Sequence, residues 1–309
     1  MKKYFAPLEG ITRYIFRNAY EKYYGGIDKY FAPFMSPADN CAMNPKEKRD
    51  VLPENNTGIN LVPQILVSKS KHFIAAAELL MDMGYNELNL NFGCPSRTVT
   101  SKRKGSGFLT ELDDMDRFLE EVYEYAGKKK LNVSIKTRIG RYCEDEWEDI
   151  LEIYNRYPIY ELIIHPRVGE DFYKNKPRME QFVMAYENSK NPVIYNGDLF
   201  CAEDISRIEK DFNVEGVMLG RGLISNPELL EQYESGTDMQ LNLDRFRKYH
   251  RELYEAYKQI ISPDLHVLYK MKELWTYWKD LFEDQKQYKK IMKAKKFAEY
   301  DAAVRPLGL

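Results

Sequence analysis

The sequence contains no long apolar run. No stretch of its 309 residues approaches the roughly 18–20 apolar residues that a membrane-spanning helix needs. The apolar run after Lys3 is short, is soon interrupted by Glu9, and does not have the form of a signal peptide. We therefore expect neither a membrane segment nor a secretory leader.

Cysteine is scarce as well. The four cysteines, Cys41, Cys94, Cys143 and Cys201, are scattered, and no Cys-x-x-Cys pair occurs. A disulfide framework and a structural zinc site are both unexpected, because each needs cysteines at characteristic spacings. This pattern predicts no bound metal and a reducing compartment, the cytoplasm.

Neither sign of charge is in large excess. The chain has 46 Lys and Arg against 48 Asp and Glu, so as a whole it is not a basic nucleic-acid binder. The charge is uneven, however: residues 241–309 carry 15 Lys and Arg against 10 Asp and Glu, and residues 1–240 carry 31 against 38. A basic end on an acidic body suggests an anionic partner. A solvated helical face would give the same count, and charge alone favours that interpretation.

Short β-rich runs alternate with amphipathic runs over the first 225 or so residues. The predicted strands are Lys3–Ala6, Tyr30–Phe34, Leu61–Leu66, Glu87–Asn91, Val133–Lys136, Glu161–His165, Val193–Asn196 and Val217–Leu219. Apolar residues near a 3.6-residue period predict helices such as Lys71–Met83 and Leu112–Ala126. Eight such units predict a parallel (β/α)8 TIM barrel. An open doubly wound sheet is the alternative, but the first turn, Ala6-Pro7-Leu8-Glu9-Gly10, lacks the G-x-G-x-x-G pattern typical of that fold.

The pattern changes near residue 240. Glycine is absent from there to Gly308, and proline occurs only at Pro263 and Pro306. The segment predicts three helices, roughly 242–260, 264–281 and 284–302. We therefore expect two domains, a catalytic barrel over residues 1–238 and an all-helical domain over residues 239–309.

Most of the predicted strands contain or end in polar or special residues, and strand ends meet at one rim of a barrel, where the active site lies. These residues are Glu9, Gln64, Asn89, Asn91, Cys94, Lys136, Arg138, His165, Asn196, Asp198 and Arg221. So many converging polar groups are costly to bury unless they are paired, and together they predict a binding site.

Lys136 and Arg138 lie two residues apart on one strand and should face the same way. A rim salt bridge would explain them, but a cofactor with delocalised negative charge, such as reduced flavin, fits the pair better. His165 ends the next strand, where contact with a ligand or cofactor is more common than in a core. The last two strands end in Asn196-Gly197-Asp198 and Gly220-Arg221-Gly222. Barrels commonly bind phosphate at these two turns, which predicts a phosphate site here.

Cys94 follows the fourth strand, between Gly93 and Pro95. It is a candidate catalytic residue, either as a nucleophile paired with His165 or as a general acid that keeps its proton near neutral pH. The adjacent basic loop contains Lys102, Arg103 and Lys104 and would lower the pKa of the thiol, so this point stays open.

Taken together, these motifs resemble those of the tRNA-dihydrouridine synthases. They are Ala6-Pro7-Leu8-Glu9-Gly10, Gln64, Leu90-Asn91-Phe92-Gly93-Cys94-Pro95-Ser96, Lys136-Thr137-Arg138-Ile139-Gly140, Ile164-His165-Pro166-Arg167, Asn196-Gly197-Asp198 and Gly220-Arg221-Gly222. The resemblance covers the whole chain: residues 1 to about 235 resemble the family's FMN barrel, and the helical tail resembles its tRNA-binding domain. The sequence departs from the family at Pro166, where the family often has glycine; proline removes a backbone donor there.

The resemblance implies reduction of the 5,6 double bond of selected uridines in tRNA. NADPH, or NADH, reduces FMN, the flavin delivers hydride to carbon 6, and Cys94 protonates carbon 5 from the opposite face. Implied FMN contacts are Pro7, Leu8, Glu9, Gln64, Lys136, His165, Asn196, Gly197, Asp198, Gly220 and Arg221. Implied contacts to the uracil edge are Asn91, Arg138 and Tyr173.

The resemblance also gives the basic tail a partner, the RNA backbone. Its lysines recur at three- and four-residue spacings, so several should share a helix face; they are Lys286, Lys289, Lys290, Lys293, Lys295 and Lys296. Two alternatives remain: another FMN barrel, similar to dihydroorotate dehydrogenase, that acts on a free pyrimidine, and a non-catalytic RNA-binding protein. The sequence leaves open which uridine is modified, the preference between NADPH and NADH, and the oligomeric state.

Overall fold

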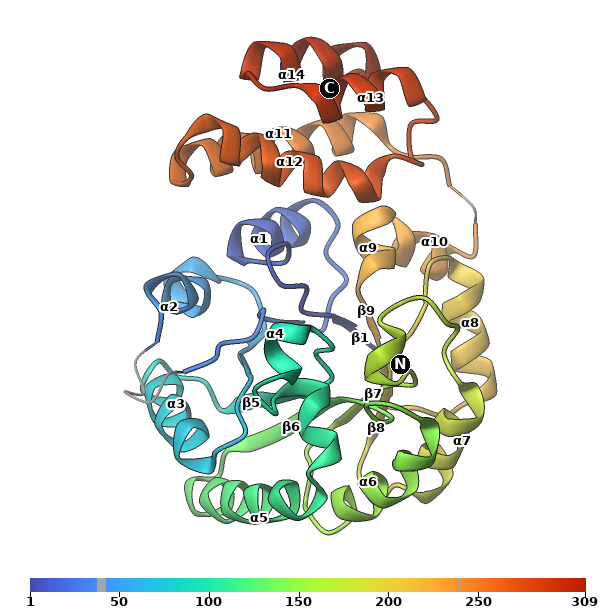
Figure 1. Ribbon diagram of the computed structural model, residues 1–309. Coiled ribbons are helices and arrows are strands. Elements are labelled where there is room, and N and C mark those ends of the chain that lie inside the picture. Colours follow the sequence, from blue (N-terminus) through green and yellow to red (C-terminus); the bar gives the residue numbers. More distant parts are fainter. Residues whose placement is uncertain (38–42, 238) are drawn as a thin grey trace.

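The chain folds into a closed parallel barrel beneath a layer of C-terminal helices (Figure 1). The computed structural model describes residues 1–37, 43–237 and 239–309, so Cys41 lies outside the described residues. The predicted fold class, a TIM-like barrel followed by helices, is confirmed. Within the described residues, no helix is both long and apolar enough to cross a membrane.

The barrel wall is made of short parallel strands. They are β1 (Lys2–Phe5), β2 (Lys29–Phe31), β3 (Leu61–Val62), β4 (Gln64–Ile65), β5 (Glu87–Phe92), β6 (Asn132–Arg138), β7 (Leu162–His165), β8 (Val193–Tyr195) and β9 (Gly216–Leu219). Their order, β3-β2-β1-β9-β8-β7-β6-β5-β4, leaves β3 and β4 at the two ends, and only Pro63 separates these two in sequence. The third predicted strand is therefore split: β3 pairs with β2, and β4 pairs with β5. Proline has no N–H for the ladder, so the split at Pro63 is expected.

Helices surround the barrel at the positions that the alternating pattern indicates. The longer ones are α1 (Tyr14–Tyr23), α3 (Ser70–Asp82), α5 (Leu112–Lys129), α6 (Trp147–Tyr154), α7 (Met179–Asn188) and α8 (Ala202–Asp211). Shorter ones are α2 (Pro45–Val51), α4 (Arg97–Thr100), α9 (Arg221–Ser225) and α10 (Leu229–Ser235). The helices predicted at 71–83 and 112–126 both form, as α3 and α5. α5 runs three residues further than expected and ends where Lys130 adopts a left-handed conformation, with φ of 55°.

Four helices follow the barrel: α11 (Leu243–Ile260), α12 (Asp264–Trp278), α13 (Gln285–Lys293) and α14 (Phe297–Val304). The first two match the prediction closely, but the third predicted helix is broken at residues 294–296. The break lets α14 fold back, so that the Tyr300 hydroxyl meets His250 Nε2 at 2.7 Å and accepts the Trp275 indole N–H at 2.9 Å. These buried contacts, between residues far apart in sequence, favour the bend over a continuous helix.

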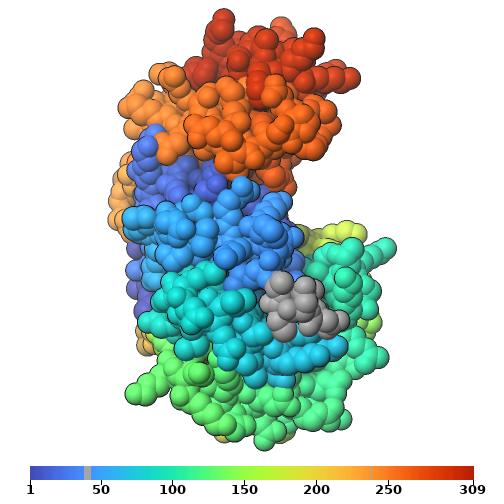
Figure 2. All heavy atoms as spheres, turned by 90° about the vertical axis from the view of Figure 1, so that its left-hand side faces the viewer, coloured from blue at the N-terminus to red at the C-terminus, as the bar shows by residue number. Residues whose placement is uncertain are grey.

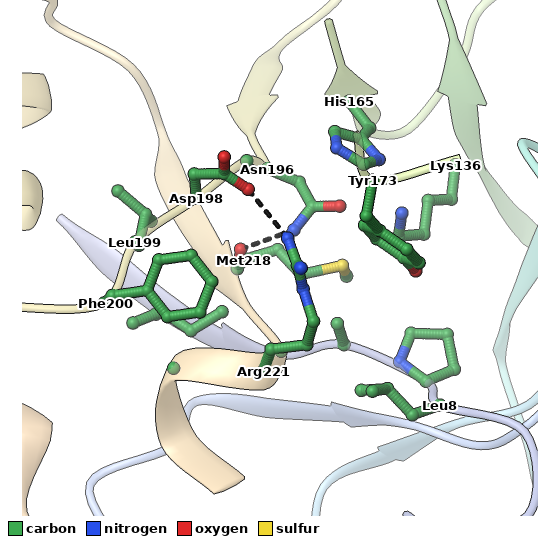
Figure 3. Close-up of a pocket in the computed structure, with 16 residues that line it drawn as sticks. Leu8, Lys136, His165, Tyr173, Asn196, Asp198, Leu199, Phe200, Met218 and Arg221 are labelled. Carbon is green, nitrogen blue, oxygen red and sulfur yellow. Dashed lines mark hydrogen bonds and ion pairs between the residues drawn. The ribbon is translucent and has the colours of Figure 1, made fainter. Parts of the chain in front are cut away.

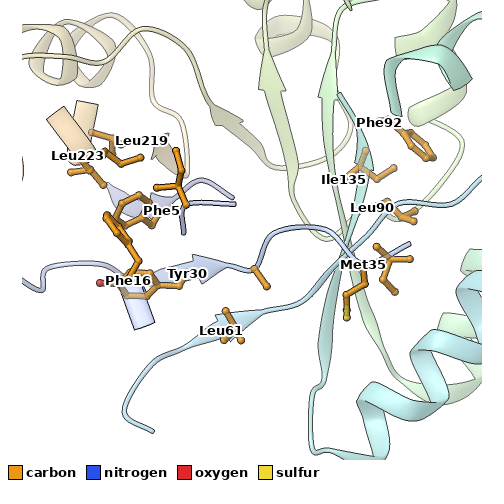
Figure 4. Close-up of a cluster of buried hydrophobic side chains, with 14 of the residues drawn as sticks. Phe5, Phe16, Tyr30, Met35, Leu61, Leu90, Phe92, Ile135, Leu219 and Leu223 are labelled. Carbon is orange, nitrogen blue, oxygen red and sulfur yellow. The ribbon is translucent and has the colours of Figure 1, made fainter. Parts of the chain in front are cut away.

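The C-terminal helices share a hydrophobic core with the barrel. The Tyr249 ring of α11 packs edge-on against Phe16 of α1, with centroids 6.2 Å apart, and the Trp278 indole N–H donates to the Ile224 carbonyl of α9 at 3.0 Å. Figure 4 shows Phe5, Phe16, Leu219 and Leu223 gathered on one side of the barrel wall. The predicted division at residue 238 stays a prediction, but the helices are not an appendage on a flexible tether.

The N-terminal end of the barrel is closed by a buried charge cluster. Lys29 donates to Glu87 at 3.0 Å and to Glu161 at 2.9 Å, and the Tyr4 hydroxyl donates to Glu161 at 2.6 Å. The Lys29 and Glu161 side chains are 11% and 3% exposed. Removing one member of such a cluster leaves an uncompensated buried charge, which costs more than the intact pair contributes.

We expect Lys29→Met to lower the free energy of unfolding by about 3 kcal/mol, because Glu161 and Glu87 lose their shared cation. Lys2→Met is the matched control: Lys2 is 49% exposed, lies 3.7 Å from Glu161, and should contribute less than about 1 kcal/mol. Urea-induced unfolding of the three proteins measures both values. Equal losses in the two variants would contradict this account of the cluster.

Candidate active site

Two adjoining cavities lie at the C-terminal ends of the strands, and their linings share Pro7, Leu8, Lys136, His165 and Tyr173. The larger, about 330 Å³, also contains Cys94, and we call it the cysteine cavity. The smaller, about 70 Å³, also contains Arg221, and we call it the arginine cavity (Figure 3). All fifteen site residues predicted from the sequence line one cavity or both. The structure thus brings the predicted set together, while the role of each residue stays a prediction.

A chain of buried amides fixes the cysteine loop. The Asn91 amide donates to Gln64 at 2.7 Å, Gln64 donates to Asn89 at 2.7 Å, and Asn89 donates to Ser134 at 2.9 Å. The Asn91 side-chain oxygen accepts the Cys94 N–H at 2.9 Å. Gln64 is fully buried and both ends of its amide are engaged, so it holds Asn91 in place from below. Asn89 and Ser134 complete this support and were not among the predicted site residues.

The Cys94 thiol is partly buried beside these amides. Burial raises its pKa and outweighs the opposing pull of Arg138 and Lys136, so the thiol keeps its proton at neutral pH. The basic loop does not reverse this, because Lys102 and Arg103 are exposed and Lys104 donates to Ser36 at 3.0 Å. Of the two roles that the sequence left open, the raised pKa favours the protonated thiol, and the role of Cys94 stays a prediction. Among the described residues, the Nε2 of His165 contacts Arg167, and no hydrogen bond joins His165 to the Cys94 thiol.

Arg138 joins the loops on either side of the site. Its guanidinium donates to the carbonyls of Gly93 at 3.0 Å, Val168 at 2.7 Å and Phe172 at 2.8 Å. The side chain is 2% exposed. As the chain stands, Arg138 lines the cysteine cavity but commits its donors to backbone carbonyls, so its first effect is to position the cysteine loop and the loop that carries Tyr173.

Lys136 is the unpaired amine of the site. Among the residues that the structure describes, no hydrogen bond or ion pair reaches its ammonium group. Burial, followed by repulsion from Arg138, lowers the pKa of Lys136 to about 7. A buried amine without a partner is costly in the free protein and becomes favourable when an anion binds. Among the described residues, Lys136 therefore does not form the rim salt bridge that the sequence offered as an alternative explanation for it.

Asp198 joins Arg221, which lines the arginine cavity, to Arg167, which lies outside its lining. Arg167 donates to Asp198 at 2.8 Å, and Arg221 donates to the same carboxylate at 2.7 Å. Arg167 also contacts His165 Nε2 at 2.9 Å. Because arginine can only donate, this nitrogen accepts, and the proton of neutral His165 lies on Nδ1. Burial and the surrounding cations lower the pKa of His165 well below its usual value, which keeps the ring neutral. Arg167 was not assigned from the sequence, although its position two residues after His165 is a usable signal.

The backbone at Gly222 and the backbone at Leu199 approach closely beside the arginine cavity, and this approach requires glycine. A Cβ atom on Gly222 would lie 2.0 Å from the Leu199 carbonyl oxygen, so no other residue fits without moving the start of α9.

The Tyr173 ring lies over the Arg221 guanidinium at 4.1 Å and beside His165 with ring centroids 6.1 Å apart (Figure 3). Tyr173 is 51% exposed and follows Phe172, whose φ is 51°.

The helical layer also contributes to the site. Glu273 and Tyr277 of α12 line the cysteine cavity together with the barrel residues. Sequence reasoning did not identify them, because nothing in the local pattern of α12 shows that it crosses the barrel mouth. One helix of the C-terminal layer therefore forms part of the wall that faces Cys94.

The family profile and the curated relatives that match this chain agree on one family. The family profile described as dihydrouridine synthase (Dus) matches residues 4–305. A probable tRNA-dihydrouridine synthase of Staphylococcus aureus is 27% identical over 271 residues, which covers 82% of this chain and 80% of the relative. A tRNA-dihydrouridine(16) synthase of Pseudomonas syringae is 29% identical over 233 residues, covering 74% and 73%. Among solved structures, a morphinone reductase variant in complex with tetrahydroNAD has a TM-score of 0.55 at 12% identity, covering 77% of this chain and 87% of that one, which shows a shared fold.

We expect Lys136→Met to stabilise the ligand-free protein at pH 7 by ~1–3 kcal/mol, because it removes an unpaired buried amine. The folded-state pKa, about 7, lies below the ordinary value of 10.5, so the unfolded chain binds more protons between these values. Wild-type stability should therefore rise relative to the variant from pH 7 to pH 10. Unfolding curves across this range measure the difference, with exposed Lys129→Met as the control. A gap between wild type and Lys136→Met that does not change with pH would argue against the burial of a neutral amine.

Proposed function

Since this chain belongs to the dihydrouridine synthase family, we propose that it reduces the 5,6 double bond of uridines in tRNA, using bound FMN and NADPH or NADH. The predicted family and enzyme class are confirmed by the match over residues 4–305. The cofactor and the residue roles are our proposal. The observation that carries it is the Cys94 thiol in the same cavity as the Lys136 amine, which has no partner among the described residues.

The donor set fits FMN. Lys136 offers an unpaired amine to the electron-rich pyrimidine edge of a flavin, and neutral His165 has its Nδ1–H free of the Arg167 contact. Arg221 and the glycine-bearing turns after β8 and β9 suit a phosphate group. When bound, FMN supplies the hydride that reduces carbon 6 of the uracil ring. The remaining predicted FMN contacts line the same two cavities: Pro7, Leu8, Glu9, Gln64, Asn196, Gly197, Asp198 and Gly220.

Cys94 supplies the proton. Its S–H bond breaks as carbon 5 of the uracil accepts the proton, and the thiolate that forms lies near the Arg138 and Lys136 cations, which favour it once charge develops. The raised pKa of the resting thiol keeps the proton available before the reaction. Asn91, Arg138 and Tyr173 surround the space beside Cys94 and would contact the uracil edge. A uridine must leave its stack to enter this cavity, as in other enzymes that act on bases.

The tRNA partner is supported by α13. Its lysines Lys286, Lys289, Lys290 and Lys293 lie within a nine-residue helix of the C-terminal layer, and none of them forms an ion pair among the described residues. A free-pyrimidine enzyme would have no use for this surface. The helical layer also lines the cysteine cavity through Glu273 and Tyr277 of α12, which supports a partner that contacts both the layer and the cavity.

We expect Cys94→Ala to leave the rate of NADPH-driven flavin reduction near that of the wild type and to lower dihydrouridine formation by roughly 10²-fold or more, because only the second half-reaction needs the proton. Stopped-flow absorbance of the flavin and quantification of dihydrouridine in tRNA measure the two halves. Cys143→Ala and Cys201→Ala are matched controls, since both thiols are exposed and lie outside the two cavities. Equal loss of both half-reactions would refute the role of Cys94 as an acid.

Charge reversal at Lys289 and Lys293 should weaken tRNA binding and reduce the slope of log Kd against log salt concentration. The reason is that a protein with fewer phosphate contacts releases fewer counterions from the RNA when it binds. The control reverses Lys128 and Lys129 at the end of α5, which lies at the opposite end of the molecule from α13 (Figure 1). Filter binding at several salt concentrations tests this. A slope that stays at the wild-type value in the Lys289 and Lys293 variant would mean that α13 does not contact the backbone.

A further inference from the structure

A third cavity, of about 360 Å³, lies where α1 and α2 meet α11 and α12. Its lining includes Arg13, Lys46, Arg49, Asp50, Tyr269 and Lys270. We call it the tyrosine cavity. None of the predicted site residues lines it, and no part of the proposed reaction uses it. Figure 2 shows the face of the molecule on which the first two helices lie beneath the C-terminal layer.

Positive charge around this cavity is poorly compensated. Lys46 and Arg49 are exposed, and neither side chain forms an ion pair among the described residues. Arg13 pairs with Glu9 at 3.1 Å, but its buried Nε–H has no partner. Arg13, Lys46 and Arg49 line the same cavity, and repulsion from Arg13, followed by burial, lowers the pKa of Lys46.

The one acid in the lining is already committed. Asp50 is buried, pairs with Arg17 at 3.3 Å and accepts the Tyr14 N–H at 2.6 Å. It therefore cannot neutralise the cations at the cavity mouth. The three cations Arg13, Lys46 and Arg49 form an anion-attracting group on the barrel side of the cavity.

Aromatic surface lies on the opposite side. Tyr269 of α12 is 55% exposed, and its ring stacks with His266 at a centroid distance of 6.0 Å and an angle of 30°. Tyr257 forms part of the buried floor. An exposed aromatic platform that faces a group of cations is the arrangement that proteins use for single-stranded nucleic acid, where the base stacks and the phosphate pairs.

The tyrosine cavity and the cysteine cavity are neighbours along α12. Lys270 lines the former, Glu273 lines the latter, and the two side chains pair at 2.7 Å; Lys270 also donates to the Gly10 carbonyl at 2.8 Å. Tyr269 and Tyr277, one in each cavity, are eight residues apart on one helix, on the order of 12 Å along its axis. An RNA strand that delivers a uridine to Cys94 would pass the tyrosine cavity within a few nucleotides of that uridine.

We propose that the tyrosine cavity binds one nucleotide of the tRNA strand close to the target uridine, with its base on Tyr269 and its phosphate among Arg13, Lys46 and Arg49. This inference rests on the proposed function and adds an anchoring site to it. Holding a second nucleotide fixes the path of the strand, so the cavity contributes to which uridine reaches Cys94. RNA is the occupant favoured here because the cavity adjoins the entrance for the base, and because Lys46 and Arg49 are exposed and can pair with an extended polyanion.

The test measures binding of an unmodified tRNA transcript to the full-length protein. Tyr269→Ala should raise Kd about tenfold, whereas Tyr269→Phe, which keeps the stacking surface, should stay near the wild type. The double variant Lys46→Gln with Arg49→Gln should weaken binding and reduce the salt slope by about 1.4. Tyr160→Ala and Lys129→Gln are the controls, because these exposed residues lie outside the cavity. Thermal unfolding verifies that each variant is folded.

The outcomes separate the inference from the proposed function. Unchanged Kd in both Tyr269→Ala and the double variant would overturn the inference, as would a wild-type protein that does not bind the transcript. If the double variant raises the KM for NADPH and leaves the Kd for tRNA unchanged, the cavity holds the dinucleotide, and the RNA assignment is wrong. A wild-type protein that binds tRNA but forms no dihydrouridine would refute the proposed function alone.

Discussion

The unpaired ammonium of Lys136 is the constraint on which the site depends. Arg138 is itself a cation and the Cys94 thiol is neutral, so neither neutralises it, and the amides of Asn91 and Gln64 are hydrogen-bonded to each other. The fold tolerates this amine because burial lowers its pKa. The same burial raises the pKa of Cys94. Removal of water from the barrel mouth is therefore one physical effect with two consequences. It leaves the Lys136 amine able to take up a proton when an anion binds, and it leaves the Cys94 thiol with its proton.

The rest of the site keeps these two groups in position. Arg138 donates hydrogen bonds to the carbonyls of Gly93, Val168 and Phe172. Asp198 joins Arg167 to Arg221. Charged side chains that look like ligand contacts in the sequence thus have a structural task as well. A guanidinium with several carbonyl partners orders two loops at once, which suits a residue that must stay fixed while a substrate enters and leaves.

The helical layer is part of the same architecture. Because Tyr249 and Trp278 pack into the barrel through α1 and α9, α12 is held across the barrel mouth and presents Glu273 and Tyr277 to the cysteine cavity. Removing residues 240–309 would expose this shared core, so truncation cannot cleanly separate RNA binding from catalysis. Substitutions on exposed faces are the informative alternative.

The sequence by itself determined the barrel, the number of β/α units and the set of rim residues, because alternation and strand-end polarity are local properties of a parallel barrel. It also carried the family motifs around Cys94. It did not determine the break at Pro63, the bend at residues 294–296, the partners of Arg138 or the involvement of Arg167. Those depend on which distant groups meet, as with Tyr300 and His250. Only the tertiary structure decided that burial raises the pKa of Cys94 and that α12 crosses the barrel mouth, because burial and helix docking are set by the packing of the whole chain.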